Sequence, residues 1–523
     1  MLRRAASAAE VMRADSGSVA RAYALALLVC LIAAAIACSA TAQSRSSQTP
    51  VLGPLLPPIP DAFSPVTLRA VNDPRTGLAA FSFKGREIPP VLHGRPGSVL
   101  RVDYVNAMST HSTEMCVDGR CTNMTNLHFH GLHVSPNAPQ DDVISMMASP
   151  GESLHYEVQI PRDQPPGLYW YHTHPHGESY QQSLDGMSGA LIVDGIERYA
   201  PEVRSMRQQI LVLRDAVLKP GDAASVAERT RAEATNVGCG SESGELKRLF
   251  TVNGILRPAV AIRPGEKQFW RIVNASPDLY ADLQVTAESM SVIALDGMPL
   301  SFHNLGRHVE AMTHVLLPPA GRVEAIVTGP PRGTPATLSS RCVTTGPDGD
   351  PNPAMVLADL TDALGAGQTP RLRTVPGSPL HRPIPSSKLA ALQQSRPDFS
   401  VIFTEDKHGF YINDKKYAPN ASPMITVPVG AYHHWSVVNR SHEVHPFHIH
   451  QVHFQMYAKD GVALHPAEWF DTVNVEPGST VDMIMDFTDP IIRGVSLFHC
   501  HLLQHEDKGM MAKILFIDPT AAH

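Results

Sequence analysis

The sequence predicts an all-β protein built from three consecutive β-sandwich domains. Two observations carry this prediction. The 523-residue chain contains 45 prolines, which helix interiors and central strands exclude, so short strands joined by many loops are expected. In addition, one strand pattern occurs three times along the chain. The composition, 43% hydrophobic and 18% charged, is that of a globular chain rather than a disordered one.

The first 42 residues have the features of an export signal. Arginines precede an apolar run at about residues 23–37, which is too short for a comfortable membrane span. The small residues Ala40-Thr41-Ala42 fit a cleavage site. We therefore expect residues 1–42 to be a signal peptide, and the mature chain to be periplasmic or secreted without a membrane span. A lipid anchor at Cys38 is disfavoured, because Ala35 stands where such signals prefer leucine.

The repeated pattern is a turn glycine followed nine residues later by an asparagine. The three pairs are Gly97 and Asn106, Gly265 and Asn274, and Gly430 and Asn439. Apolar and polar residues alternate between them, which is typical of a half-buried strand. We therefore expect domains at residues 62–200, 201–370 and 396–523, with a linker rich in Pro, Ser, Gly and Arg over residues 371–395.

Two of the seven cysteines lie in the expected signal peptide. Cys116 and Cys121 bracket a short turn and could close a small disulfide in an oxidising compartment. Cys239 and Cys342 could pair only if the fold brings them together. This leaves Cys500 alone, between two histidines.

The 26 histidines are clustered rather than evenly spread. Four His-x-His pairs are present: His128 and His130, His172 and His174, His448 and His450, and His499 and His501. On a strand, residues i and i+2 point to the same face, so each pair presents two imidazoles side by side. Imidazole is a good copper ligand. One such pair is more often structural than metal-binding, but four pairs in the first and last domains indicate a metal cluster.

A second ligand set surrounds Cys500. A thiolate with two histidines and a weak, long axial methionine is the ligand set of a blue electron-transfer copper. His445, Cys500, His505 and Met510 supply that set, three of them on one loop. Taken alone, Cys500 could be a buried structural cysteine, but its position between two cluster histidines argues against this.

The segments HFHG, HTH, HPFHIH and HCHLLQHEDKGM resemble the four copper motifs of the three-domain multicopper oxidases, the family of laccases, bacterial cuprous oxidases and bilirubin oxidases. The resemblance covers nearly the whole mature chain. It implies three cupredoxin-like Greek-key domains and four coppers: one blue type 1, one type 2 and a type 3 pair. It also implies that one-electron oxidation of a substrate is coupled to the four-electron reduction of dioxygen to water.

The resemblance further implies a role for each ligand. His128 and His448 would hold the type 2 copper, His130, His172 and His501 one copper of the type 3 pair, and His174, His450 and His499 the other. Cys500 would then give electrons a short covalent route between the two sites. Asp141, with Asp142 beside it, and Glu506 resemble carboxylates that deliver protons in the family, although each could instead only orient a ligand histidine.

The chain departs from the family pattern at Gln451, where glycine is usual, and we expect little effect on ligation. His133, His176 and His453 lie near the motifs without a matching role, and we interpret them as loop or supporting histidines. Domain two carries no motif histidine and is expected to bind no copper.

The sequence alone does not identify the substrate. An axial methionine suggests a lower potential than an apolar residue would give, so we expect phenols, aromatic amines, bilirubin-like pigments or metal ions such as Cu(I). The 19 methionines are scattered, which weakens the case for a dedicated cuprous oxidase. A net charge of −7 gives no indication of nucleic-acid binding, and we expect a monomer whose partners are dioxygen and a small-molecule or metal-ion reductant.

Two other functions compete with this hypothesis. One is an exported copper-resistance or sequestration protein whose oxidase activity is incidental. The other is a structural protein of cupredoxin fold that has lost its ligands, which is disfavoured because all twelve ligand residues are present in the sequence.

Overall fold

The computed structural model describes residues 53–109, 123–217, 248–286, 288–304, 306–362, 372–382 and 384–521. The predicted signal peptide, the Cys116–Cys121 pair and Cys239 lie outside these residues. Cys342 is disulfide-bonded, and Cys500 is a buried free thiol. Within the described segments, no helix combines the length and the apolar character needed to cross a membrane.

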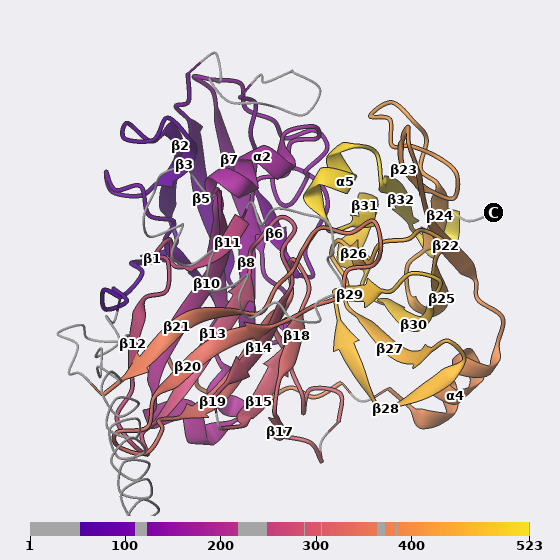
Figure 1. The fold of residues 1–523 in the computed structure, drawn as a ribbon. Coiled ribbons are helices and arrows are strands. Elements are labelled where there is room, and N and C mark those ends of the chain that lie inside the picture. Colours follow the sequence, from indigo (N-terminus) through magenta and orange to yellow (C-terminus); the bar gives the residue numbers. More distant parts are fainter. Residues whose placement is uncertain are drawn as a thin grey trace, which may run out of the picture. The chain divides into compact units, whose positions relative to one another are not determined.

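The all-β prediction is confirmed, because the strands form six sheets that follow one another in three pairs (Figure 1). In the first pair, a four-stranded sheet has the order β3 (Ala79–Ser82), β2 (Val66–Asn72), β5 (Val99–Asn106) and β7 (Ser153–Gln159). Its five-stranded partner has the order β1 (Asp61–Phe63), β4 (Val91–Gly94), β9 (Ser188–Val193), β8 (Gly167–His172) and β6 (His128–His130).

The second pair of sheets lies between residues 207 and 361. One sheet has the order β11 (Arg248–Val252), β10 (Arg207–Val217), β13 (Lys267–Asn274), β19 (Arg322–Thr328), β15 (Met290–Leu295) and β16 (Met298–Pro299), with β17 (Glu310–Met312) paired to β15. The other has the order β12 (Ala259–Ala261), β21 (Met355–Thr361), β20 (Ala336–Arg341), β14 (Ala281–Val285) and β18 (Val315–Leu317).

The third pair lies between residues 399 and 517. One sheet has the order β23 (Gly409–Ile412), β22 (Phe399–Asp406), β25 (Ala431–Asn439), β30 (Thr480–Phe487), β27 (Phe454–Lys459) and β28 (Val462–Phe470). The other has the order β24 (Ile425–Pro428), β32 (Met511–Ile517), β31 (Gly494–Cys500), β26 (His445–Ile449) and β29 (Thr472–Val475).

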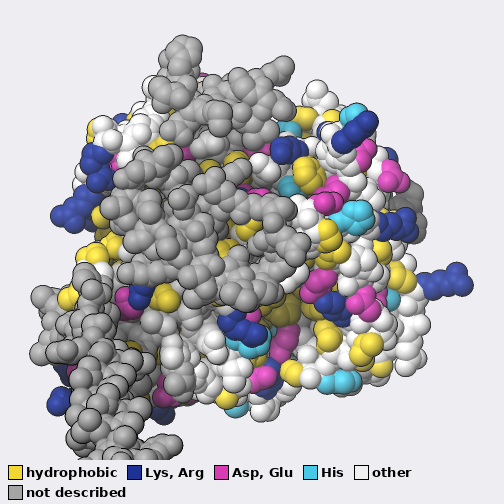
Figure 2. All heavy atoms as spheres, in the orientation of Figure 1, with side chains coloured by type: hydrophobic (Ala, Val, Ile, Leu, Met, Phe, Trp, Pro, Cys, Tyr) yellow, Lys and Arg dark blue, Asp and Glu magenta, His cyan; other side chains and the backbone are white. Residues whose placement is uncertain are grey.

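Among the residues that the structure describes, helices are few and short. The α-helices are α2 (Ser179–Asp185), α4 (Ser386–Gln394) and α5 (Leu503–Asp507), and the 3₁₀ turns are η2 (Ile196–Arg198), η3 (Pro201–Ser205), η4 (Pro490–Ile492) and η5 (Pro519–Ala521). Helix α4 occupies the end of the segment that we expected to be a linker. On the face shown in Figure 2, acidic and basic side chains are interspersed over the part of the surface that the structure describes.

The three sequence repeats become the equivalent strands β5, β13 and β25. Each pairs in parallel with an earlier strand of its own sheet: β5 with β2, β13 with β10, and β25 with β22. The turn glycines have φ values of +80°, +70° and +101°, a left-handed conformation that glycine adopts without steric cost. This is the physical reason that glycine recurs at Gly97, Gly265 and Gly430.

The repeated asparagines are fully buried and close the loop that follows each strand. The side-chain amide donates at 2.7–3.1 Å to two backbone carbonyls: Asn106 to Asn123 and Ala148, Asn274 to Leu279 and Leu317, and Asn439 to Glu443 and Val475. Because a buried amide must find such partners, the asparagine is needed wherever this loop occurs. In the third repeat the loop leads directly to His445.

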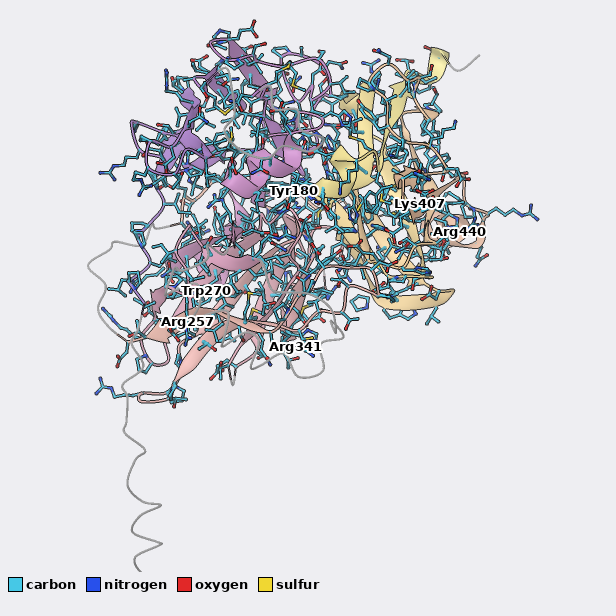
Figure 3. The ribbon with its side chains drawn as sticks, turned by 45° about the horizontal axis from the view of Figure 1, so that its top comes forward. Tyr180, Arg257, Trp270, Arg341, Lys407 and Arg440 are labelled. Atoms are coloured by element: carbon cyan, nitrogen blue, oxygen red, sulfur yellow. The ribbon has the colours of Figure 1, made fainter. Side chains whose placement is uncertain are left out.

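Each sandwich has its own apolar core, and smaller apolar clusters and polar contacts join one sandwich to the next. The cores include Phe81, Trp270 and Phe447, all fully buried. Tyr180 of α2 lies where the first and third sandwiches meet (Figure 3), and its backbone N–H donates to Asp507 of α5 at 2.9 Å. Such contacts hold the strand ends that carry the histidine motifs against one another.

Candidate copper centres

Strand pairing sets the histidine pairs opposite one another. In the antiparallel pair β6–β8, His128 stands opposite His172, and in β26–β31, His448 stands opposite His499. The expectation that each His-x-His pair lies on a strand holds in full only for the first pair. In the other three pairs the second histidine follows the last strand residue, where the chain turns into the space between the sandwiches.

The eight histidines of the four pairs gather in one buried cluster formed by the first and third sandwiches. Three groups have ligand atoms within 4.8 Å of one another: His128, His130 and His448; His130, His172 and His501; and His174, His450 and His499. In the last group, His499 Nε2 lies 3.2 Å from His450 Nε2 and 3.5 Å from His174 Nε2. The structure thus brings together all eight histidines that the sequence singled out.

The ring nitrogens that face into this cluster are available to bind metal ions. Buried nitrogens without any hydrogen-bond partner include His128 Nε2, His130 Nδ1, His172 Nε2, His448 Nε2 and both ring nitrogens of His501. Leaving buried polar atoms unpaired is costly, and their convergence from both sandwiches indicates a common ligand. Burial, reinforced by the neighbouring imidazoles, holds the pKa of His172, His450 and His501 well below the ordinary value, so these rings stay neutral, as metal ligation requires.

The outer nitrogens of the same rings are held by the protein. His172 Nδ1 donates to the Thr173 carbonyl at 2.9 Å, and His448 Nδ1 to the Asp471 carbonyl at 2.7 Å. His130 Nε2 lies 3.1 Å from the Asp471 carboxylate. These contacts fix the orientation of each ring, which is the arrangement seen around metal-binding histidines.

A second group surrounds Cys500. The sulfur lies 3.5 Å from His445 Nδ1 and 4.0 Å from His505 Nδ1, and these two nitrogens are 3.3 Å apart. Met510 is fully buried in the same core, and its carbonyl accepts the Cys500 N–H at 3.0 Å. Burial raises the pKa of the Cys500 thiol, so the sulfur keeps its proton until a metal displaces it. The sequence-predicted set of one thiol and two imidazoles is therefore assembled.

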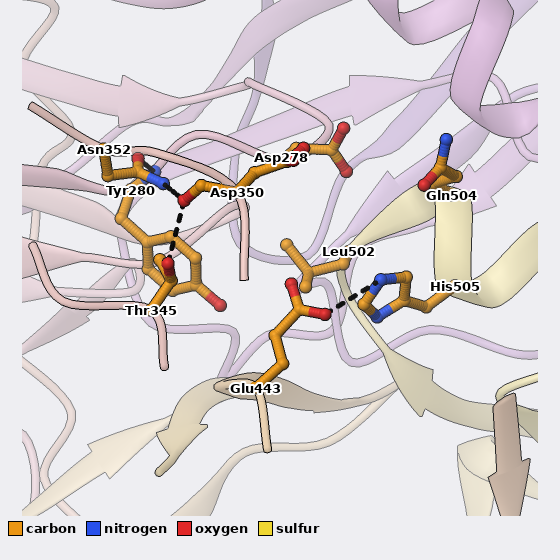
Figure 4. Close-up of a pocket in the computed structure, with 9 residues that line it drawn as sticks. All are labelled: Asp278, Tyr280, Thr345, Asp350, Asn352, Glu443, Leu502, Gln504 and His505. Carbon is orange, nitrogen blue, oxygen red and sulfur yellow. Dashed lines mark hydrogen bonds and ion pairs between the residues drawn. The ribbon is translucent and has the colours of Figure 1, made fainter. Parts of the chain in front are cut away.

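The outer faces of His445 and His505 differ. His445 Nε2 is 2.8 Å from Ser441 Oγ and is fully buried. His505 stacks on Phe410 with ring centroids 3.8 Å apart, and its Nε2 lies 3.5 Å from Glu443 Oε2. The far nitrogen of His505 therefore lies near Glu443 (Figure 4), whereas that of His445 is fully buried and lies 3.7 Å from Glu405 Oε2.

The two candidate acids contact different histidines of the cluster. Asp141 lies 3.0 Å from His128 Nδ1 and accepts the Phe129 N–H at 2.9 Å. Glu506 sits between two rings, 3.5 Å from His174 Nδ1 and 3.4 Å from His499 Nδ1. Burial, followed by the neighbouring Asp507 carboxyl, holds the pKa of Glu506 well above its ordinary value. Asp142 instead accepts the N–H groups of its own loop.

Gln451 does more than the sequence indicated. Its φ of +65° is in the left-handed region, which explains why glycine would fit there. The side-chain amide donates to Asp141 Oδ2 at 2.8 Å and accepts a hydrogen bond from Ser496. Gln451 thus links Asp141 of the first sandwich to the third sandwich. This contact could not be predicted from the sequence.

The supporting histidines also find partners. His133 Nε2 donates to His453 Nδ1 at 2.6 Å, and His453 Nε2 donates to the Asp296 carbonyl at 2.8 Å. His176 packs edge-on against Tyr417. Sequence reasoning missed Asp471 and Arg322, which lie behind His130, because no spacing joins residues that are 149 positions apart.

Two segments of the chain match family models described as multicopper oxidase, residues 80–198 and 386–518. The multicopper oxidase mco of Staphylococcus haemolyticus is 23% identical over 442 residues, 83% of each chain. A laccase of Haloferax volcanii is 25% identical over 415 residues, 75% of this chain and 67% of the relative. A solved multicopper oxidase of Campylobacter jejuni, titled a metallo-oxidase, has a TM-score of 0.65 at 21% identity, covering 89% of this chain and 95% of the other.

The two matched segments are those that carry the four histidine motifs, and the structural likeness establishes the fold. The chain belongs to the multicopper oxidase family. It is accordingly a copper-dependent oxidoreductase that uses dioxygen as electron acceptor.

Proposed function

We propose that the protein is an exported, monomeric oxidase that takes single electrons at a type 1 copper and uses them to reduce dioxygen to water at a type 2 copper and a type 3 pair. His445, Cys500, His505 and Met510 would hold the first copper, and the eight paired histidines the other three. The observation that carries the proposal is the segment His499-Cys500-His501, because one strand end supplies ligands to both groups. When bound, copper supplies the one-electron redox chemistry.

The chain itself provides the electron route. Cys500 belongs to the group with His445 and His505, while its two sequence neighbours belong to the histidine cluster. His499 Nδ1 donates to the Cys500 carbonyl at 2.9 Å, which adds a hydrogen-bonded path to the covalent one. Electrons that enter at His505 therefore have few bonds to cross before they reach the cluster.

Proton delivery falls to Asp141 and Glu506. Reduction of one dioxygen to two waters consumes four protons, and both acids lie within 3.5 Å of cluster histidines. The raised pKa of Glu506 keeps a proton available in a buried site. Asp141 also orients His128, so its role as proton carrier and its role as positioning residue must be separated by experiment.

The substrate class we propose at this level is broad: phenols, aromatic amines, bilirubin-like pigments, or metal ions such as Cu(I). Among the similar proteins, a laccase supports the organic substrates of this range, and a metallo-oxidase supports the metal ions.

The test is copper analysis with visible and EPR spectra of the purified, copper-loaded protein, together with oxygen consumption during phenol oxidation. About four coppers per chain, an intense blue band and both blue and normal copper signals are expected from these ligand sets. A colourless protein that binds little copper would overturn the proposal and favour a binding or structural role.

A further inference from the structure

Gln451 has a backbone conformation that is uncommon for glutamine. Its φ is +65°, and in this left-handed region a side chain crowds the neighbouring backbone, whereas glycine fits freely. A strained residue of this kind persists only where its surroundings hold it in place. The residue is 2% exposed, so its amide lies inside the protein. The hydrogen bonds of this buried amide therefore have to account for a glutamine at this position.

Both ends of the Gln451 amide make hydrogen bonds. The nitrogen donates to Asp141 Oδ2 at 2.8 Å, and the oxygen accepts from the Ser496 hydroxyl. With the opposite orientation, the amide oxygen would face a carboxylate oxygen and no hydrogen would lie between them. Ser496 is 3% exposed and belongs to β31, the strand that ends at Cys500. The amide is thus fixed to the strand that leads to the proposed copper ligands.

Three donors hold the carboxyl group of Asp141. Gln451 donates to Oδ2, the Phe129 N–H donates to Oδ1 at 2.9 Å, and His128 Nδ1 lies 3.0 Å from Oδ2. The other ring nitrogen of His128, Nε2, is buried and has no hydrogen-bond partner among the described residues. Because Nδ1 meets the carboxylate, Nε2 is left as the nitrogen that can bind a metal. Loss of the Gln451 donor would loosen the carboxylate that orients this ring.

The same hydrogen bond joins two sandwiches at the histidine cluster. His128 comes from the first sandwich and His450 from the third, and their rings stack with centroids 3.9 Å apart and planes at 17°. Gln451 directly follows His450 in the chain. Its bond to Asp141 therefore closes a loop of contacts that contains both stacked imidazoles. A movement of one sandwich against the other would stretch this bond, so the bond restrains the spacing of the two rings.

We propose that Gln451 is a positioning residue of the oxygen-reducing centre, and that it acts by holding Asp141 against His128. The proposal rests on the proposed oxidase function, in which His128 is a ligand of the type 2 copper. Loss of a partner behind a metal-binding histidine usually lowers metal affinity or activity by about 10–100-fold. Gln451 acts one contact further out, so the effect should lie at the lower end of this range. It should also be confined to the histidine cluster.

Two variants separate the amide from the backbone. Gln451→Met keeps the length of the side chain and the backbone strain but has no amide. Gln451→Gly also removes the amide, and it relieves the strain because glycine adopts this conformation freely. In denaturant titration we expect the glycine variant to be the more stable of the two. A loss of function that both variants share is therefore due to the amide and not to the stability of the fold.

The first measurement does not depend on turnover. The copper-loaded protein is dialysed against increasing concentrations of a chelator, and the type 2 copper that remains is measured by EPR. We expect both variants to lose this copper at an about tenfold lower chelator concentration than the wild type. The hyperfine pattern of the type 2 signal should change, and the type 1 signal should not.

The second measurement separates the two half-reactions by stopped flow. Bleaching of the blue band by a phenol should proceed at the wild-type rate in both variants, because electron entry does not involve Gln451. Recovery of the band under oxygen should be slower by about tenfold. Equal slowing of the two phases would contradict a role confined to the oxygen-reducing centre.

Action through Asp141 is tested by a double-mutant cycle. In the Asp141→Ala background, Gln451 has lost the group that it positions. Adding Gln451→Met should then lower the resistance of type 2 copper to the chelator by no more than about twofold further, the range within which independent effects agree. A full additional loss would show that Gln451 acts by another route and would overturn the proposal.

The matched control is Gln268→Met. Gln268 is a fully buried glutamine of the second sandwich whose amide is also bonded at both ends. Its nitrogen donates to the Ala261 carbonyl at 3.0 Å, and its oxygen accepts from the Trp270 indole at 3.2 Å. The replacement should lower the free energy of unfolding but leave the type 2 spectrum, the chelator resistance and the recovery rate unchanged.

The outcomes distinguish this proposal from the proposed function. If the wild type binds copper and consumes oxygen, but both Gln451 variants keep its chelator resistance, EPR pattern and recovery rate, the positioning role is wrong and the oxidase function stands. If Gln268→Met changes the type 2 spectrum as much as Gln451→Met, the effect reflects fold stability and the positioning role is again wrong. If the wild type itself binds little copper, the oxidase function fails and the positioning role fails with it.

Discussion

Arg322 and Asp471 form a fully buried, two-point ion pair between the second and third sandwiches. Arg322 Nη1 donates to Asp471 Oδ1 at 2.7 Å and Nη2 to Oδ2 at 2.5 Å. The same carboxylate lies 3.1 Å from His130 Nε2, so the pair also sets the orientation of a cluster histidine. The second sandwich thus supports a centre to which it contributes no side chain of the histidine groups.

Arg322→Ala should therefore destabilise the fold by about 3–5 kcal/mol, since it leaves a buried carboxylate unpaired. The measurement is the free energy of unfolding from denaturant titration of the copper-free protein. Arg101→Ala breaks an exposed pair with Glu157 and is the control, with an expected loss of about 0–1 kcal/mol. An equal decrease in the free energy of unfolding in the two variants would contradict a structural role for the buried pair.

Cys500→Ser should abolish the intense blue absorption while the histidine cluster still binds copper, because the thiolate is the defining ligand of a blue site. EPR should retain the normal copper signal and lose the blue one. Substrate-driven oxygen consumption should stop, since the electron route is interrupted. A variant that keeps its colour would show that Cys500 is not a copper ligand.

Asp141→Asn should slow turnover by roughly 10–100-fold, because it alters the group that orients His128. Asp142→Asn is the matched control, since Asp142 bonds to its own loop rather than to a histidine. The role of Asp141 is decided by the solvent deuterium isotope effect on turnover. A changed isotope effect indicates proton delivery, whereas an unchanged effect with weaker copper binding indicates positioning alone.

Glu506→Gln should slow oxygen reduction while electron entry at the blue copper stays fast. Stopped-flow bleaching of the blue band measures electron entry, and its recovery under oxygen measures reduction of the acceptor. The expected loss is roughly 10²–10⁴-fold in the second step, the usual contribution of a positioned acid. Recovery at the wild-type rate would rule out proton delivery by this residue.

His93 should stabilise the fold more in mild acid than at alkaline pH. Burial by itself lowers the pKa of His93, but the hydrogen bonds and charges of Asp194 and Asp61 outweigh it, so the pKa is raised. A raised folded pKa means that the contribution is complete below the unfolded value of about 6.5 and is lost as pH rises through the folded value.

The stability difference between wild type and His93→Gln should therefore be larger at about pH 5.5 than at about pH 8.5. Denaturant titration at both pH values measures it. Gln159, an exposed residue of β7 whose side chain does not ionise, provides the control variant Gln159→Ala, for which the two differences should agree. A pH-independent effect at His93 would contradict the assignment.

The sequence predicted the β-class and the residues of the histidine groups, because both depend on local patterns. Alternation with a period of two residues indicates strands. The His-x-His and Cys-x4-His spacings keep these side chains close together whatever the arrangement of the strands. The exact domain boundaries stay predictions. Arg322, Asp471, Gln451 and Glu443 could not be predicted, since each acts through a partner from another part of the fold.

The separation of the proposed ligands into residues 128–174 and 445–510 also affects the order in which they are synthesised. The ribosome makes residues 445–510 only after residues 128–174, so a chain halted between the two segments cannot assemble the proposed oxygen-reducing centre. Both ends must fold and dock before the histidines meet. We therefore expect the copper cluster to form only after both segments are made, and a chain that stops before residue 445 to carry out no oxygen chemistry.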